Sequence, residues 1–300
     1  MTANIPASIH RKLLNVSREQ KRPFEEILQY FTMERFLFRL SQTKHRDRFV
    51  LKGALLMQVW APEIARATKD IDFLGKGENS PENLAKVIKE CCEVEIIEDG
   101  LKFNPESILA EKIKEGEEYE GIRISFRASL GKAKIAMQID VGFGDAVFPA
   151  PKVEQYPSLL DFEGAKLACY PRETVIAEKF QAMVQLGIIN SRMKDFYDIW
   201  YLSQNFKFEG EVLMKAVKGT FSRRETEIDL NAVALTREFS ADATKQAQWK
   251  GFLRKTRLGT VPPDLKEVVE AIGHFLIPVA KTAKGGQLFK EKWDPRGPWK

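Results

Sequence analysis

Two aspartates one residue apart, Asp70 and Asp72, constrain most strongly how this chain can fold. They lie in residues 66–73 (RATKDIDF), where the flanking apolar residues predict the end of a buried strand. Because side chains alternate across a strand, both carboxylates face one side while Ile71 and Phe73 pack on the other. Two buried carboxylates repel each other, and a hard divalent cation such as Mg²⁺ is the usual partner of such a pair. A lone Asp-x-Asp is nevertheless common, so a purely structural pair stays open as an alternative at this point.

A short strand and a glycine turn precede this pair. Residues 49–57 (FVLKGALLM) predict a strand, a turn at Lys52–Gly53 and the start of a helix. Backbone N–H groups at a helix start can hold phosphate groups. The order of strand, glycine turn, helix and Asp-x-Asp strand therefore favours a metal and phosphate site over a structural pair.

A third carboxylate lies near the end of another predicted strand. In residues 133–145 (AKIAMQIDVGFGD) apolar side chains alternate along one face, which places Asp140 on the other face with Gln138. We expect Asp140 to act as a general base for an attacking hydroxyl or as a further metal ligand. The alternative is an aspartate that caps the strand end.

The second half of the chain predicts helices that carry charged residues among apolar ones. Glu178 and Lys179 lie inside an apolar helical stretch, where a lysine can hold phosphate groups. Asp195 and Asp198 are three residues apart and are therefore neighbours on one helical face. Each of these charges could equally form an intramolecular ion pair.

Other segments carry weaker signals. Residues 94–97 and 101–103 predict strands joined by a hairpin turn at Asp99–Gly100, whereas the acid-rich residues 111–120 predict a surface loop. The basic residues of the first long helix, Arg35 and Arg39 among them, are expected on a solvated face.

Changes in composition along the chain predict four regions. They are a basic N-terminal arm (1–22), a sheet core that carries the three aspartates (23–165), a helical domain expected to contribute its charged residues to the same site (166–280) and an extended tail (281–300).

Net charge, apolar runs and cysteine content limit the cell compartment and the kinds of partner that the sequence favours. The 300 residues carry a formal net charge of +5, which suits a nucleic-acid partner but does not require one. No apolar run approaches the roughly 18 residues of a membrane span, and the first residues lack a signal-peptide pattern. Three cysteines form neither a disulfide framework nor a zinc pattern. We therefore expect a cytoplasmic protein with no membrane partner.

Four blocks in order resemble the AbiEii/AbiGii-type nucleotidyltransferase toxins of bacterial abortive-infection and type IV toxin–antitoxin systems. The blocks are FVLKGAL at 49–55, RxTxDxD at 66–72, ExxxxEK at 173–179 and RxKDFxD at 192–198. Each block is weak alone, but four in this order are fairly specific. The resemblance, which covers about residues 24–205, implies an α+β fold of the polymerase-β-like nucleotidyltransferase type. That fold has a mixed sheet with flanking helices, followed by a helical C-terminal region.

The resemblance also implies roles for single residues in Mg²⁺-dependent transfer of a nucleotide from an NTP, with Mn²⁺ as a substitute ion. Asp70 and Asp72 would ligate the metal together with Asp140, Lys179 would bind phosphate, and Asp195 would complete the catalytic set. Nucleotide contacts are implied at Lys52, Gly53, Ala54, Arg66, Thr68, Lys179, Lys194 and Asp198. Where the wider superfamily often has Gly-Ser, this chain has Gly53–Ala54 and lacks one hydroxyl contact to phosphate.

By this resemblance the acceptor is RNA, with tRNA 3′ ends as the best-known target class. The expected effect is growth inhibition that a separately encoded antitoxin relieves. Two alternatives stay open: transfer of the nucleotide to a protein hydroxyl, and a non-catalytic module that binds nucleotide or RNA. A degenerate module would be expected to lose a carboxylate or Lys179, and this chain keeps both.

Overall fold

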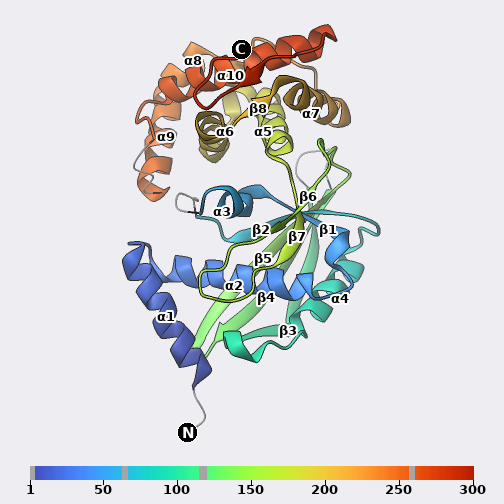
Figure 1. Cartoon of the computed structure of the whole chain (residues 1–300), viewed down its shortest axis with the longest axis vertical. Coiled ribbons are helices and arrows are strands. Elements are labelled where there is room, and N and C mark those ends of the chain that lie inside the picture. Colours follow the sequence, from blue (N-terminus) through green and yellow to red (C-terminus); the bar gives the residue numbers. More distant parts are fainter. Residues whose placement is uncertain (1–3, 63–66, 115–119, 257–260) are drawn as a thin grey trace. The chain divides into compact units, whose positions relative to one another are not determined.

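The computed structural model describes residues 4–62, 67–114, 120–256 and 261–300, which form two compact units (Figure 1). The first unit comprises Met1–Gly144 and Lys152–Cys169, and the second comprises Asp145–Pro151 and Tyr170–Lys300. Among the described helices, none is long and apolar enough to cross a membrane.

A mixed β-sheet forms the centre of the first unit. Within the described residues its strands are β1 (Phe49–Lys52), β2 (Asp70–Gly75), β3 (Leu101–Lys114), β4 (Glu120–Leu130), β5 (Ala133–Phe143), β6 (Lys152–Gln155) and β7 (Lys166–Cys169). Their order across the sheet is β3-β4-β5-β2-β1-β7-β6. Strand β2 pairs antiparallel with β1 and parallel with β5, while β3, β4 and β5 form an antiparallel meander.

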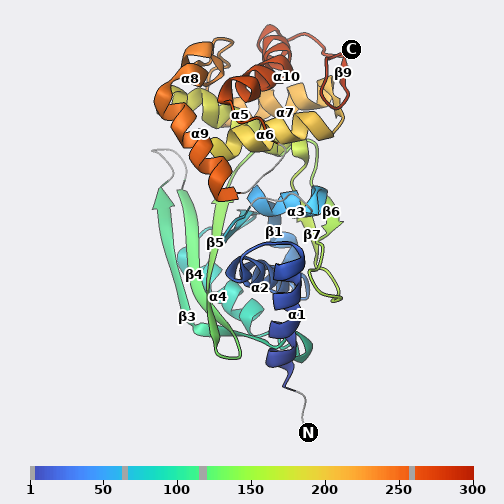
Figure 2. The ribbon, with the colours of Figure 1, turned by 90° about the vertical axis from the view of Figure 1, so that its left-hand side faces the viewer.

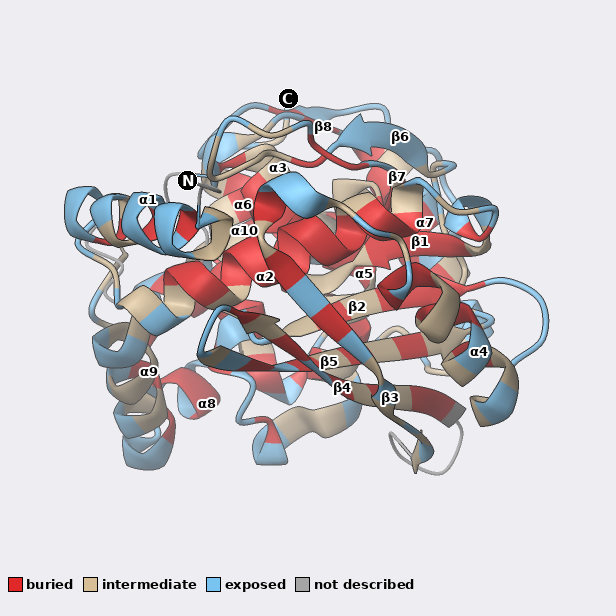
Figure 3. Cartoon of the chain, turned by 90° about the horizontal axis from the view of Figure 1, so that it is seen from below, coloured by how far each residue is buried: buried red, intermediate tan, exposed pale blue. Residues whose placement is uncertain are grey.

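Helices cover one face of this sheet. The helices of the first unit are α1 (Ile5–Glu19), α2 (Phe24–Ser41), α3 (Leu56–Trp60) and α4 (Pro81–Cys92), with short 3₁₀ turns η1 (Arg46–Arg48), η2 (Gly53–Leu55) and η4 (Ile97–Asp99). Figure 2 shows α1, α2 and α4 on the same side of the strands. Phe36 of α2 packs against Phe126 of β4, with ring centroids 5.3 Å apart. The burial colours of Figure 3 show α2 buried along most of its length.

Two arginines of α2 are buried, so the solvated face expected for them is wrong. Arg39 Nη1 lies 2.6 Å from Asp99 Oδ2, and Arg35 Nε lies 3.3 Å from the same oxygen. Asp99 is 0 % exposed, and the two guanidinium groups supply the charge that its burial requires. Arg39 also donates to the carbonyl oxygens of Val94 and Ile96.

These contacts explain two further differences from the sequence prediction. Residues 94–97 form no strand, because Arg39 pairs with carbonyl groups that a neighbouring strand would need, and Asp99–Gly100 is therefore not a hairpin turn. The described part of the predicted loop at 111–120 is a strand instead. Glu111 of β3 lies opposite Arg123 of β4, and these opposite charges favour this register of the two strands.

The second unit is built from helices around an aromatic core. Its helices are α5 (Arg172–Leu186), α6 (Met193–Asn205), α7 (Gly210–Arg223), α8 (Arg237–Ala241), α9 (Ala243–Thr256) and α10 (Leu265–Gly285), with 3₁₀ turns η5 (Gly187–Ile189) and η6 (Val233–Leu235). Strands β8 (Phe208–Glu209) and β9 (Lys292–Trp293) pair antiparallel. Trp299 stacks on Phe275 of α10, with centroids 5.6 Å apart, so the end of the chain packs on this unit. The predicted α+β fold with a helical C-terminal region is confirmed.

Candidate active site

Three aspartates meet on the face of the sheet opposite to α2. Ile71 and Phe73 of β2 are fully buried, and alternation turns Asp70 and Asp72 to the other face. In the parallel pairing of β2 with β5, Asp72 lies directly beside Asp140. One carboxylate oxygen from each of the three aspartates lies within 4.8 Å of the others. The structure therefore brings together the carboxylates that the sequence predicts as metal ligands.

A row of charged residues crosses the sheet through this cluster. Strand register places Lys52 opposite Asp72, Asp72 beside Asp140, Asp140 opposite Arg123, and Arg123 opposite Glu111. The charges alternate along the row except at the centre, where Asp72 and Asp140 are neighbours. Like charges on adjacent strands destabilise a sheet, so this pair of aspartates requires a nearby cation.

Arg123 holds Asp140 through two parallel hydrogen bonds. Its Nε and Nη2 donate to Oδ1 and Oδ2 over 2.9 and 2.8 Å, and the Gln138 side chain also donates to this carboxylate. The hydrogen bonds to Asp140 raise the pKa of the Arg123 guanidinium above its ordinary value. Such a bidentate pair fixes the carboxylate in orientation as well as in charge.

Sequence reasoning did not identify Arg123 as part of the site. The signal that could have found it is the alternation of residues 121–127 (GIRISFR), which puts Arg123 on the polar face of a predicted strand. The same alternation puts Asp140 on the polar face of the following strand.

Gly53 lies directly against the cluster. Its φ of +74° is left-handed, and a Cβ atom added to it would lie 1.9 Å from Asp72 Oδ2. The position therefore requires glycine for two reasons, namely backbone conformation and space. Of its neighbours, Lys52 is half-buried at the end of β1 and Ala54 is buried in η2.

Two other predicted nucleotide contacts precede β2. Thr68 Oγ1 donates a hydrogen bond to Asp70 Oδ1. Arg66 lies outside the described residues.

A second charged cluster lies in the second unit. Lys179 of α5 places its Nζ 2.5 Å from Asp195 Oδ1 and 2.9 Å from Asp198 Oδ2, both of α6. The side chains of these residues are 14, 6 and 3 % exposed, respectively. The ion pairs that the sequence left open are therefore present, whereas Lys194 is exposed.

Glu178, the neighbour of Lys179, takes part in another ionic contact. Its Oε2 lies 3.7 Å from Arg224 Nη2, which also lies 3.0 Å from Asp145 Oδ1. Gln181 accepts a hydrogen bond from Arg224 Nη1. These contacts attach the segment Asp145–Pro151 to the helices of its own unit.

The donor set of the first unit fits a divalent metal ion. Carboxylate oxygens are the ligands that Mg²⁺ prefers, and Mg²⁺ sites in nucleotide-processing enzymes commonly use one or two carboxylates plus substrate phosphates. Asp70 and Asp72 correspond to this pattern. Asp140 differs, because both of its oxygens already accept hydrogen bonds from Arg123.

Comparisons with known proteins assign the family. The family model described as nucleotidyl transferase AbiEii toxin, type IV TA system, matches residues 35–271. No match was found among curated proteins. A candidate nucleotidyltransferase from Helicobacter pylori of known structure is 16% identical, with a TM-score of 0.45, over 87% of this chain and 95% of that chain. The structure of JHP933 from Helicobacter pylori is also 16% identical, with a TM-score of 0.44, over 84% and 89% of the two chains. The chain belongs to the AbiEii family of nucleotidyl transferase toxins of type IV toxin–antitoxin systems.

Proposed function

We propose that this nucleotidyltransferase toxin transfers a nucleotide from an NTP to an RNA acceptor, with the tRNA 3′ end as the target. The observation that carries the proposal is the convergence of Asp70, Asp72 and Asp140 within 4.8 Å in a chain of this family. The net charge of +5 is compatible with an RNA partner. As a type IV toxin it is paired with an antitoxin, which we propose is encoded separately and relieves growth inhibition.

We assign the metal site to the first unit. Asp70 and Asp72 would hold Mg²⁺, or Mn²⁺ in its place, and Asp140 would be the third ligand. A bound ion would neutralise the negative charge that develops on the phosphates of the NTP during transfer. Arg123 fixes the orientation of the Asp140 carboxylate, so as a ligand Asp140 would bind the ion through an oxygen that also accepts a hydrogen bond. Gly53 leaves room for the carboxylate of Asp72.

The second unit would contribute groups that bind the nucleotide. Lys179 is a compact cation suited to phosphate, and Asp195 holds its ammonium group in place. The remaining proposed nucleotide contacts are Lys52, Gly53, Ala54, Arg66, Thr68, Lys194 and Asp198.

A transfer assay tests this function. Purified protein is incubated with each α-labelled NTP, Mg²⁺ and total bacterial tRNA, and a parallel reaction contains protein acceptors instead of RNA. We expect label in tRNA with the wild-type protein and at least about tenfold less with Asp72→Asn, since even loss of a residue that only supports a metal ligand typically costs about 10- to 100-fold. Asp47→Asn is the matched control, because the Asp47 side chain is 86% exposed.

Two further variants test the second unit. Lys179→Met is expected to lose transfer, whereas Lys215→Met, at an exposed lysine of α7, should retain it. If label appeared on protein alone, the acceptor would be a protein hydroxyl and not RNA. NTP binding without any transfer would contradict the enzymatic function and favour a binding module.

A further inference from the structure

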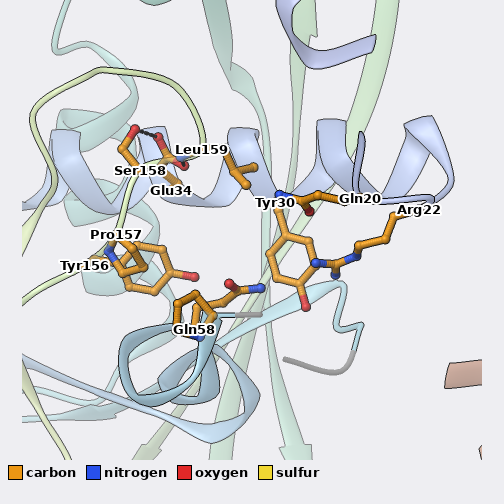
Figure 4. Close-up of a pocket in the computed structure, with 10 residues that line it drawn as sticks. Gln20, Arg22, Tyr30, Glu34, Gln58, Tyr156, Pro157, Ser158 and Leu159 are labelled. Carbon is orange, nitrogen blue, oxygen red and sulfur yellow. Dashed lines mark hydrogen bonds between the residues drawn. The ribbon is translucent and has the colours of Figure 1, made fainter. Parts of the chain in front are cut away.

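A cavity of about 460 Å³ lies in the first unit, and the three aspartates are not among the residues that line it. It is bordered by the turn between α1 and α2, by α2 and α3, and by the segment that follows β6 (Figure 4). Its lining includes Arg22, Tyr30, Glu34, Gln58, Tyr156 and Ser158, none of which is proposed above to act in transfer. A volume of this size falls within the range of about 300–1,000 Å³ that is typical of small-ligand pockets.

The hydroxyl of Tyr156 points into this cavity. Tyr156 is 4% exposed, and its hydroxyl has no hydrogen-bond partner in the part of the chain that the structure describes. Figure 4 shows the hydroxyl directed toward Gln58 and Tyr30. The backbone N–H of Tyr156 donates to the carbonyl oxygen of Ala165 over 2.7 Å, which anchors the main chain at this residue. A buried hydroxyl without a hydrogen-bond partner is destabilising, and a ligand in the cavity that bonds it would remove this cost.

The other groups around the cavity favour an uncharged, planar ligand. The Arg22 guanidinium is already paired with Glu26 at 2.5 Å, and it lies over the Tyr30 ring at 4.9 Å from the centroid. The Gln58 side chain hydrogen-bonds Tyr30, and its second polar group together with the Tyr156 hydroxyl offers a donor or an acceptor beside aromatic surface. Proteins recognise an unpaired nucleobase with these groups, because amides and hydroxyls bind its edge while aromatic and guanidinium planes stack on its face.

Positive charge continues from the cavity along α1. Arg11, Lys12 and Arg18 are exposed on this helix, and its end leads through Lys21 to Arg22 at the cavity wall. Such residues can bind the phosphates of a nucleic-acid strand whose base enters the pocket.

Helix α2, which forms one wall of the cavity, also contacts the residue before β2. The side chain of Gln29, next to Tyr30 on α2, donates to the carbonyl oxygens of Lys69 and Ala136 over 3.4 and 3.1 Å. Lys69 directly precedes Asp70, so the wall of the cavity is connected to the strand that carries the aspartates.

We propose that this cavity is a second nucleic-acid subsite, which binds one unpaired nucleobase of the RNA acceptor. The proposal rests on the function proposed above, since it assigns part of the acceptor to a separate place in the first unit. The Tyr156 hydroxyl and the Gln58 carboxamide bind the edge of the base, and the basic residues of α1 bind the adjoining phosphates.

The variant Tyr156→Phe tests this proposal, because it removes only the hydroxyl that has no partner in the described protein. Binding of a fluorescein-labelled single-stranded oligoribonucleotide is measured by fluorescence anisotropy, in EDTA and without NTP so that no transfer occurs. We expect Tyr156→Phe to weaken binding about fivefold, as for loss of one neutral hydrogen bond. Thr220→Val is the matched control, since the buried Thr220 hydroxyl of α7 also has no partner among the described residues. It should bind RNA as the wild type does.

Thermal unfolding of each variant separates a binding defect from misfolding. A folded Tyr156→Phe protein that binds the oligoribonucleotide with wild-type affinity would overturn the proposal, as would a wild-type protein that does not bind it. Competition between the labelled oligoribonucleotide and free nucleosides shows whether the cavity binds a base of RNA or a free nucleoside. If Tyr156→Phe weakened only nucleoside binding, the assignment to the RNA acceptor would be wrong. Asp72→Asn reports separately on transfer, since it should lose transfer but keep the anisotropy signal.

Discussion

Individual residues balance the charge of the three aspartates in different ways. Asp140 is held by a guanidinium, Asp70 accepts a hydrogen bond from Thr68, and Asp72 lies against the backbone of Gly53. An ion placed among them would therefore meet Asp140 as a carboxylate whose two oxygens already accept hydrogen bonds from Arg123.

Gly53 provides the first prediction at this scale. Gly53→Ala combines a left-handed conformation that costs about 1–2 kcal/mol with a Cβ atom 1.9 Å from Asp72 Oδ2. We expect loss of free energy of unfolding and weaker Mn²⁺ binding, because Asp72 must move. Gly77→Ala is the matched control, since Gly77 has φ +86° and no atom within 4 Å of an added Cβ. Equal effects of the two substitutions on Mn²⁺ binding would show that the contact with Asp72 is unimportant.

The buried carboxyl of Glu34 predicts how the free energy of unfolding depends on pH. Burial raises the pKa of its carboxyl from 4.5 to about 7, although it accepts hydrogen bonds from Ser158 and Leu159. Because the folded-state pKa is the higher one, this group's stabilisation is complete below about pH 4.5 and is lost as the pH rises through about 7. The loss is about 3 kcal/mol in total.

Glu34→Gln has no such titration. Its free energy of unfolding should therefore rise relative to the wild type between about pH 5 and about pH 8, as measured by urea denaturation. A difference between the two proteins that is independent of pH would contradict the buried, neutral carboxyl.

At the scale of elements, α2 is held to η4 by a buried ionic cluster. Asp99 accepts hydrogen bonds from Arg35, Arg39 and the backbone N–H of Leu101. Asp99→Ala leaves two guanidinium groups buried without their partner, so we expect it to lower the free energy of unfolding by about 3–5 kcal/mol. Asp47→Ala, at an exposed aspartate, should change it little. A similar small effect at Asp99 would mean that solvent reaches the arginines.

The same elements show how far the sequence predicts the fold. Alternation and turn chemistry are local, so the strands of Asp72 and Asp140 and the turn at Gly53 could be predicted. The expected strand end at Asp70 and Asp72 is wrong, because β2 begins at Asp70 and continues to Gly75. The partners of Arg39 and Arg123 could not, because each contact depends on how distant segments pair. Asp99 lies 60 residues from Arg39, and Asp140 lies 17 residues from Arg123.

For the whole molecule, the proposed catalytic residues divide between two units. The aspartates and Gly53 belong to the first, whereas Lys179, Asp195 and Asp198 belong to the second. Each cluster has its own described contacts, so a substitution in one unit can be examined without disturbing the ion pairs of the other. The chain belongs to a family of nucleotidyl transferases, and the central structural claim is that the aspartate cluster binds a divalent ion.

Binding of Mn²⁺, followed by electron paramagnetic resonance, tests this claim most directly. We expect a Mn²⁺ site in the intact wild-type protein from which Mg²⁺ displaces the Mn²⁺ ion. Its affinity should fall about ten- to a hundredfold in Asp72→Asn and stay unchanged in Asp47→Asn. If folded Asp72→Asn bound Mn²⁺ as tightly as the wild type, the aspartate cluster would not be the metal site.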